Sequence, residues 1–148
     1  MTTHLTLAAE DAQDLEIISA RLQDAVAQVK DLAWLPRSRR FVALFNRFKW
    51  ESAQASPRQN LRVRAQLCFE RVQSVKSHRI RHDGEAVAAL LAIKYTPRDG
   101  EDPGGMVELL FAGGGMIRLD VECLDASLAD VSGAWAARGR PDHDSKER

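Results

Sequence analysis

The chain of 148 residues is 45% hydrophobic and 28% charged, which is enough for one compact domain with a sizeable core. Its 21 basic and 21 acidic side chains cancel, which excludes a uniformly basic nucleic-acid-binding protein and a strongly acidic disordered chain. No apolar run approaches the ~20 residues that span a membrane. The first residues carry no basic group followed by an apolar stretch. We therefore expect a cytoplasmic protein with no membrane partner.

The charges are unevenly distributed along the chain. Residues 1–35 contain two basic and six acidic side chains, residues 36–98 fourteen and four, and residues 99–148 five and eleven. Two arrangements explain this distribution: the basic middle segment forms an exposed cationic face, or the acidic ends fold over it and neutralise it. The sequence leaves both open.

The first periodic segment predicts an amphipathic helix over residues 11–25, capped by Asp11. Its apolar residues recur at steps of three, four and four, namely Leu15, Ile18, Leu22 and Val26. Ahead of this helix, Leu5 and Leu7 alternate with a polar residue and favour a short strand.

Beyond this helix the pattern becomes typical of strands. Segments 26–35 and 40–50 are rich in β-branched and aromatic residues and predict a hairpin. A loop is expected over 52–60, which contains a proline and no large apolar residue. Residues 61–70 alternate between the two faces of a strand, of which one is apolar.

Two further hairpins and a helix complete the pattern. Strands at 74–81 and 87–95 are joined across an Asp-Gly pair, and strands at 106–112 and 116–122 across three glycines. A second helical stripe, at steps of four, three and four, predicts a C-terminal amphipathic helix packed on the sheet. It consists of Leu124, Leu128, Val131 and Trp135.

These elements predict the α+β class, with about seven antiparallel strands in a curved sheet or partly open barrel and an N-terminal and a C-terminal amphipathic helix packed on it. The lack of crossover helices between strands excludes a parallel doubly wound sheet and its dinucleotide crevice. We expect one domain over residues 1–137 and a disordered tail over 138–148, which has no large apolar residue.

Seven antiparallel strands followed by one helix resemble the element order of pleckstrin-homology-like barrels over residues 26–137, although the N-terminal strand and helix depart from that plan. At the level of sequence, three segments are similar to a small family of bacterial proteins defined only as a domain of unknown function. They read AAEDAQDLEIISARLQDA, LPRSRRFVALFNRFKWE and LLFAGGGMIRLDVECLDASLADV. The resemblance extends to about Val131 and supports a single domain. It implies no reaction, ligand or catalytic residue.

No motif indicates catalysis, a metal or a cofactor. The glycines at 113–115 lie between two predicted strands and favour a tight hairpin, whereas a phosphate-binding loop would precede a helix. His78 and His82 would lie roughly 13 Å apart on a strand, too far to share a metal ion. Cys68 and Cys123 are far apart in the sequence and suggest neither a metal pair nor a disulfide. One interpretation of Cys68 is a reactive thiol whose pKa is lowered by Arg62 and Arg64, but we favour a structural thiol.

The strongest functional signal is a group of basic residues on two neighbouring strands, with Phe45, Phe48 and Trp50 among them. Basic side chains hold phosphates and aromatic rings stack on bases, so this combination is typical of single-stranded nucleic-acid binding. The candidate anion-binding residues are Arg40, Arg47, Lys49, Arg62 and Arg64. Buried aromatics beneath an ordinary solvated face, with arginines paired to the acidic segments, explain the same pattern.

Three functional hypotheses follow. The first, which we favour, is a small non-catalytic domain that binds nucleic acid or another polyanion through the basic strands. The second is a protein-interaction module that holds a partner at a sheet edge or in the groove beside the last helix. The third is an enzyme whose site is assembled from residues distant in sequence.

Overall fold

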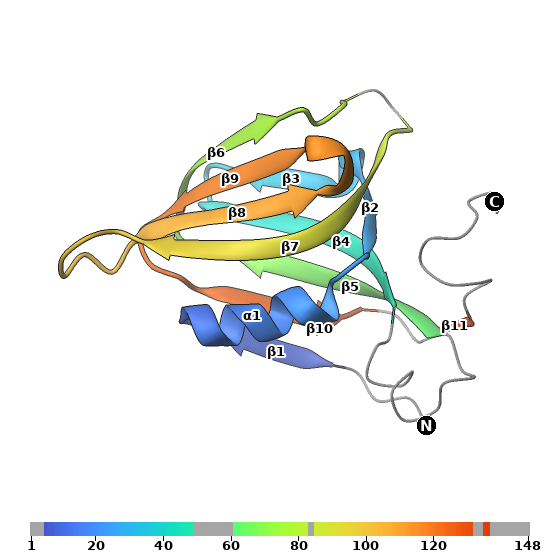
Figure 1. Cartoon of the computed structure of the whole chain (residues 1–148), viewed down its shortest axis with the longest axis horizontal. Coiled ribbons are helices and arrows are strands. Elements are labelled where there is room, and N and C mark those ends of the chain that lie inside the picture. Colours follow the sequence, from blue (N-terminus) through green and yellow to red (C-terminus); the bar gives the residue numbers. More distant parts are fainter. Residues whose placement is uncertain (1–4, 49–60, 83–84, 132–134, 137–148) are drawn as a thin grey trace.

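The structure, a computed structural model, describes residues 5–48, 61–82, 85–131 and 135–136 (Figure 1). Within these residues the chain forms one α-helix, α1 (Ala12–Arg21), two short 3₁₀ helices and eleven strands. The 3₁₀ helices are η1 (Val29–Asp31) and η2 (Ala112–Gly114). The strands are β1 (Thr6–Ala9), β2 (Val26–Gln28), β3 (Leu32–Leu35), β4 (Arg40–Phe48), β5 (Leu61–Phe69), β6 (Val72–His78), β7 (Val87–Pro97), β8 (Gly105–Phe111), β9 (Met116–Val121), β10 (Ala126–Asp130) and β11 (Trp135–Ala136).

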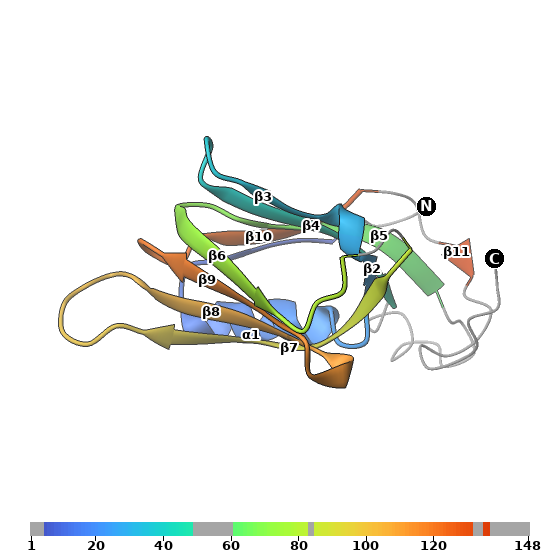
Figure 2. The same ribbon diagram turned by 90° about the horizontal axis from the view of Figure 1, so that it is seen from above.

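The described strands join into one open antiparallel sheet. Their order is β1-β10-β5-β4-β2-β7-β8-β9-β6, with β3 paired to β4 and β11 paired to β5 beside this path. The sheet folds over at β2, which pairs with both β4 and β7. Two layers therefore face each other, one containing β1, β10, β5, β4 and β3 and the other β7, β8, β9 and β6 (Figure 2).

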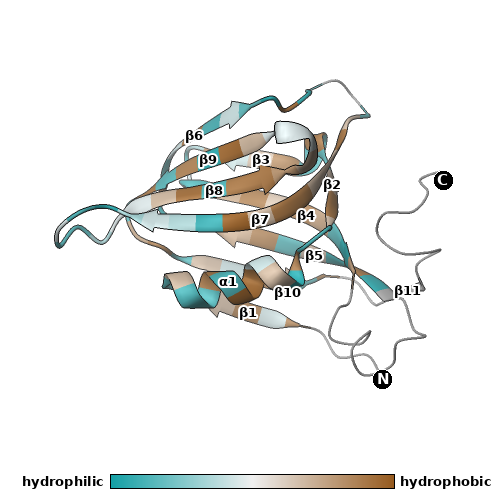
Figure 3. Ribbon diagram, in the orientation of Figure 1, coloured by the Kyte–Doolittle hydropathy of each residue, from teal (hydrophilic) through white to brown (hydrophobic). Residues whose placement is uncertain are grey.

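The hydrophobic core lies between the two layers. Its largest fully buried apolar side chains come from both layers and from α1, and include Leu15, Ile18, Leu22, Phe41, Phe45, Leu67, Phe69, Leu90, Leu109 and Leu119. Each such side chain contributes about 1.5–3 kcal/mol by leaving water. Apolar residues run along β7, β8 and β9, whereas β6 is largely hydrophilic (Figure 3). α1 packs against β7 and β1, which belong to different layers, and so covers the core on that side.

The predicted N-terminal helix is confirmed as α1, although it ends four residues earlier than expected. The Asp14 N–H donates to Oδ1 of Asp11 at 2.8 Å, so Asp11 caps the helix as predicted. Leu15 and Ile18 point into the core. The Ile93 N–H donates to Oγ of Ser19 at 2.9 Å and ties the helix to β7.

The predicted C-terminal helix is wrong, because residues 126–130 form β10. These residues also alternate, with Ala126 and Leu128 buried and Ser127 exposed. β10 lies between β1 and β5, whose backbones satisfy its N–H and C=O groups on both sides. This pairing outweighs the helical stripe, of which Val131 is 51% exposed. The pleckstrin-homology-like arrangement, which places a helix here, is not confirmed.

The predicted hairpin between residues 74–81 and 87–95 is wrong, because β6 pairs with β9 and β7 pairs with β2 and β8. The other predicted strands are present with shifted ends, except that the one over 26–35 is interrupted. The segment predicted as one strand over 26–35 is divided by η1, since β2 turns away from β4 to pair with β7. The three glycines form the predicted tight hairpin, in which the Phe111 N–H donates to the Gly115 carbonyl at 2.9 Å. Gly113 and Gly114 have φ values of 84° and 88°, a region that favours glycine.

Several predictions fall on residues outside the described ranges. They concern the loop over 52–60, the Asp-Gly turn at 83–84 and the tail over 138–148. The single domain over 1–137 likewise stays a prediction.

A charged pair is buried beside the apolar core. Arg47 points to the same side of β4 as Phe41 and Phe45, and its side chain is 0% exposed. Its Nε and Nη2 donate to the two carboxylate oxygens of Asp130 at 3.0 and 3.1 Å. The Leu5 N–H donates to Oδ2 of Asp130 at 2.9 Å. The pair therefore reaches across β5 and joins β4 to β10 and to the residue before β1.

Replacement of Arg47 tests how far the fold depends on this pair. Arg47→Met is expected to lower the free energy of unfolding by about 3–5 kcal/mol, because it leaves the Asp130 carboxylate buried without its counter-charge. Urea unfolding followed by tryptophan fluorescence measures this loss. Arg40→Met on the same strand is the control, since the exposed Arg40–Glu70 pair is worth less than about 1 kcal/mol. Equal losses in the two variants would contradict the role assigned to Arg47.

A second substitution tests the physical cause of the loss. Adding Asp130→Asn to Arg47→Met is expected to restore part of the unfolding free energy, because no charge then remains buried. The new amide oxygen still accepts from the Leu5 N–H. A double variant less stable than Arg47→Met alone, in the same urea experiment, would show that the buried charge is not the cause.

Candidate functional site

Among the strands that have an edge without a strand partner in the part of the chain that the structure describes, β3 and β6 lie near each other, whereas β1 is at the opposite end of the sheet. β3 pairs only with β4, and β6 only with β9. The turn after β3 lies close to the start of β6, where the Val72 N–H donates to the Arg39 carbonyl at 2.9 Å, and the two strands diverge from this point (Figure 2). We call the space between the free edges of β3 and β6 the seam.

An apolar pocket of about 150 Å³ opens in the seam. β3 and β6 supply its two sides, and residues of the core, of η1 and of the segment after β6 complete it. The lining residues are Val29, Leu32, Trp34, Phe41, Val75, Ser77, Ile80, His82 and Ile117. An apolar cavity of this size accommodates a benzene-sized group. The seam pocket therefore has room for one apolar side chain.

The β6 side of the seam is basic. Residues 72–82 contain no acidic side chain, and the exposed cationic or titratable residues among them are Lys76, His78, Arg79, Arg81 and His82. Lys30 of η1 is exposed as well. An anionic partner would approach this edge with favourable electrostatics.

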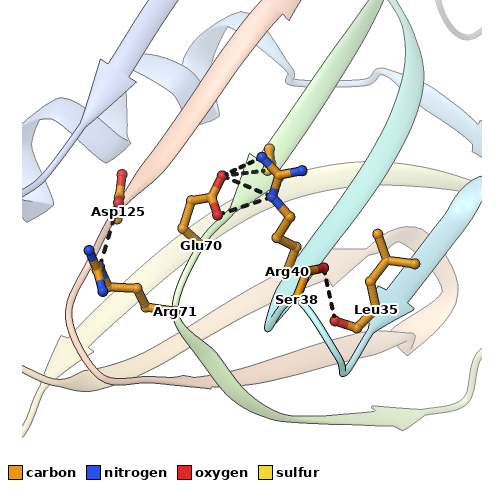
Figure 4. Close-up of polar contacts among 7 residues, drawn as sticks. Leu35, Ser38, Arg40, Glu70, Arg71 and Asp125 are labelled. Atoms are coloured by element: carbon orange, nitrogen blue, oxygen red, sulfur yellow. Dashed lines mark hydrogen bonds and ion pairs between the residues drawn. The ribbon is translucent and has the colours of Figure 1, made fainter.

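At its narrow end the seam meets a polar cleft of about 480 Å³, where three turns come together. The lining residues are Ser38, Arg39, Glu70, Arg71, Glu122 and Asp125. Nη1 of Arg39 lies 2.9 Å from Oε2 of Glu122, and Nε of Arg71 lies 3.9 Å from Oδ2 of Asp125. Figure 4 shows the second of these pairs beside the Arg40–Glu70 pair. The charges of this cleft therefore compensate one another.

The backbone also fastens the three turns together. Arg39 and Arg71 both have a φ of 56°, in the left-handed region that costs a non-glycine residue roughly 1–2 kcal/mol. In this conformation the Arg39 carbonyl accepts from Val72, and the Arg71 carbonyl accepts from the Glu122 N–H at 3.0 Å. The strained turns thus hold β3–β4, β5–β6 and β9–β10 at fixed positions around the narrow end of the seam.

Two of the predicted anion-binding residues carry carboxylate partners. Nε and Nη2 of Arg40 donate to the carboxylate of Glu70 at 2.9–3.1 Å, which holds the pKa of that carboxyl below its usual range. Arg47 is buried against Asp130. Both guanidinium groups are therefore engaged within the protein.

The remaining predicted residues lie elsewhere on the sheet. Arg62 is opposite Phe48 at the far end of the β4–β5 ladder, roughly 25 Å along the strands from Arg40. Its Nη1 donates to the Asn46 carbonyl at 3.1 Å, and burial lowers the pKa of its guanidinium. Nε of Arg64 donates to Oδ1 of Asn46 at 3.4 Å. Lys49 lies outside the described residues, so the four described arginines form no single patch.

Acidic residues of the C-terminal third pair with four of the fourteen basic residues of the middle segment. The pairs between the two segments are Arg39–Glu122, Arg47–Asp130, Arg71–Asp125, Arg98–Asp102 and Arg98–Asp120. Of the two arrangements left open by the sequence, the acidic end folds over the middle at these positions.

The sequence did not point to the residues of the seam pocket. Trp34, Val75 and Ile80 lie on segments predicted as strands, but only the pairing of the strands shows which edges stay free. One signal was present: β6 carries polar residues on both faces, a composition typical of an edge strand.

The described residues contain neither a metal-ligand cluster nor a helix that could span a membrane. No group of three or more metal-ligating side chains gathers there, and His78 and His82 line different pockets. No helix among them is long and apolar enough to cross a lipid bilayer.

The fold and the seam define a small antiparallel β domain with a covering helix and a free strand edge beside a pocket. The chain belongs to the family described as "Protein of unknown function (DUF2948)", whose model matches residues 5–143. The family resemblance seen in the sequence is thereby confirmed. No curated protein and no solved structure matches the chain.

The thiol of Cys68 has a raised pKa. Burial and the neighbouring Glu70 carboxylate raise its pKa to about 11, which outweighs the opposing effect of Arg40. The alternative that Arg62 and Arg64 lower this pKa is therefore wrong. Sγ of Cys68 donates to Oε2 of Glu70 at 3.6 Å.

Alkylation tests this assignment of Cys68. In a Cys123→Ser variant, iodoacetamide at pH 8 is expected to react about 100-fold more slowly with the folded protein than with the denatured one, since a pKa raised by two units leaves a hundredfold less thiolate. Mass spectrometry measures the rates. Adding Glu70→Gln should accelerate the folded reaction. Similar rates in the folded and denatured chains would contradict a buried, protonated thiol.

Proposed function

We propose that this protein is an interaction module that binds an extended segment of a partner protein along the free edge of β6, with one apolar side chain of that segment in the seam pocket. The observation that carries this proposal is the position of an unpartnered strand edge directly beside an apolar pocket. When a strand is added to a sheet edge, main-chain hydrogen bonds supply affinity and pockets supply specificity.

The geometry of β6 supports this mode of binding. Val75 and Ser77 line the pocket, whereas Lys76 between them points to the outer face. An added strand lies about 4.8 Å from its neighbour, and its side chains alternate in step with it. Every second side chain of the partner would therefore point toward the pocket.

Polyanion binding through β4 and β5 has less support. Arg40 and Arg47 are paired with carboxylates, and Arg62 lies at the opposite end of the ladder from Arg40. A polyanion would have to displace these internal partners, whereas a strand at the edge of β6 displaces none among the described residues.

A neutral peptide tests the proposed edge. The probe is a capped peptide of about seven residues, the length of an ordinary strand, in which valine alternates with threonine. In amide NMR spectra of the full chain, resonances of residues 72–82 and of β3 are expected to shift on titration, while those of β1 stay in place. Shifts confined to β1 or to the polar cleft would contradict the proposal. Methylation of alternate peptide nitrogens should abolish binding in at least one of the two registers, because it removes the main-chain donors.

A side chain placed in the pocket should block the same probe. Ser77→Phe is expected to weaken peptide binding at least about tenfold, because the new ring occupies the space for the partner's side chain. Ser74→Phe on the outer face of β6 is the matched control and should leave the affinity nearly unchanged. The readout is the fluorescence of Trp34 in a variant that keeps it as the only tryptophan. Equal effects of the two substitutions would rule out the pocket as the anchor site.

A further inference from the structure

The outer face beside β6 indicates which side chains a bound segment carries. This inference rests on the proposed function. We infer that the bound segment alternates apolar and acidic residues, with the apolar side chains directed into the seam and the acidic ones beside Lys76, His78 and Arg118. The inference follows from the two faces of one strand, which offer different environments to an added neighbour.

The inward face of β6 is apolar. Val75 lies opposite Leu119 and Ser77 opposite Ile117, and both line the seam pocket. Trp34 faces them across the seam. His82 is the one titratable residue in the pocket lining, and the other lining residues offer a charged side chain no counter-charge in exchange for its lost hydration. Inward positions of the partner are therefore apolar.

The outward face of the same strand is cationic. Lys76 lies directly opposite Arg118, and His78 lies opposite Met116 on β9. These four residues, together with Ser77, line a surface pocket of about 300 Å³. Two cations directly opposite each other on a sheet repel, so an anion that reaches both is stabilised.

The carboxylates on this outer face already have guanidinium partners. Nη2 of Arg118 lies 3.2 Å from Oε2 of Glu108, and Nη2 of Arg98 lies 2.7 Å from Oδ1 of Asp120. Lys76 has no carboxylate partner within the described residues. The free edge beyond it is the side from which an additional acidic group can approach.

An added strand that follows this alternation carries an acid, an apolar residue and an acid at successive positions. Lys76 and His78 occupy successive outward positions of β6, so acidic side chains at two outward positions of the partner find a cationic or titratable neighbour. The partner class is therefore a protein with an extended segment of alternating acidic and β-branched or aromatic residues.

Three capped peptides of equal length test this inference. Valine occupies the inward positions of each, and the outward positions carry glutamate, threonine or lysine. At low ionic strength we expect the glutamate peptide to bind about tenfold more tightly than the threonine peptide, since two or three partly exposed charge pairs each contribute a few-fold. The lysine peptide should bind most weakly, and added salt should reduce the differences.

A charge reversal at the edge provides the matched variant. Lys76→Glu should weaken the glutamate peptide, strengthen the lysine peptide and leave the threonine peptide nearly unchanged. Lys94→Glu is the control, because Lys94 is exposed on β7, opposite Glu108 and away from the free edge. Equal responses to the two reversals would overturn the assignment of Lys76.

The results of these experiments distinguish the acidic pattern of the partner from the proposed binding at the edge of β6. If the threonine peptide binds at β6 and glutamate brings no gain, the acidic pattern is wrong and the edge-binding function stands. If none of the three peptides binds, both fail, and Lys76 serves only to keep the edge from pairing with other chains. A single-stranded oligouridylate that binds residues 72–82 and displaces the glutamate peptide would also overturn the inference, in favour of nucleic acid.

Discussion

The buried ion pair between Arg47 and Asp130 sets the register of the strands on one side of the molecule. Arg47 shares the inward face of β4 with Phe45, and a guanidinium buried there without a counter-charge would cost several kcal/mol. β10 must therefore place Asp130 on the inward face, opposite Ala65 of β5. A slip of one residue would turn Asp130 outward and expose Leu128 with it. The carboxylate and the backbone N–H of Asp130 each form one hydrogen bond with Leu5, and so Asp130 also positions β1.

Local patterns predicted the parts of this fold that local interactions decide. The alternation over 61–70 and the stripe of α1 reflect which faces are buried, and both elements are present. The C-terminal stripe failed because Leu124 and Leu128 fit a helix and a strand equally well, and only the neighbouring strands select between the two. The burial of Arg47 could be predicted, because Arg47 shares a face of β4 with Phe41 and Phe45. Its partner, 83 residues away, could not.

The seam depends on tertiary pairing throughout, which places it beyond local patterns. β3 is an edge because β2 leaves β4 for β7, and β6 is an edge because the chain continues to β7 on the far side of the layer. Neither pairing can be predicted from the residues of β3 or of β6 alone. The polar composition of β6 is the exception, since a strand buried in mid-sheet would need apolar residues on at least one complete face.

Although the net charge of the chain is zero, its arginines have different environments. Those at the turns and in the core are matched by carboxylates of the C-terminal third, so they fasten strands together and contribute little field outside the protein. The run from Lys76 to Arg81 contains no acid and borders a free edge. Lys76 in this run has no carboxylate partner among the described residues, so it adds positive potential at the edge of β6. The charge distribution of the sequence and the strand pairing of the structure therefore both point to the edge of β6.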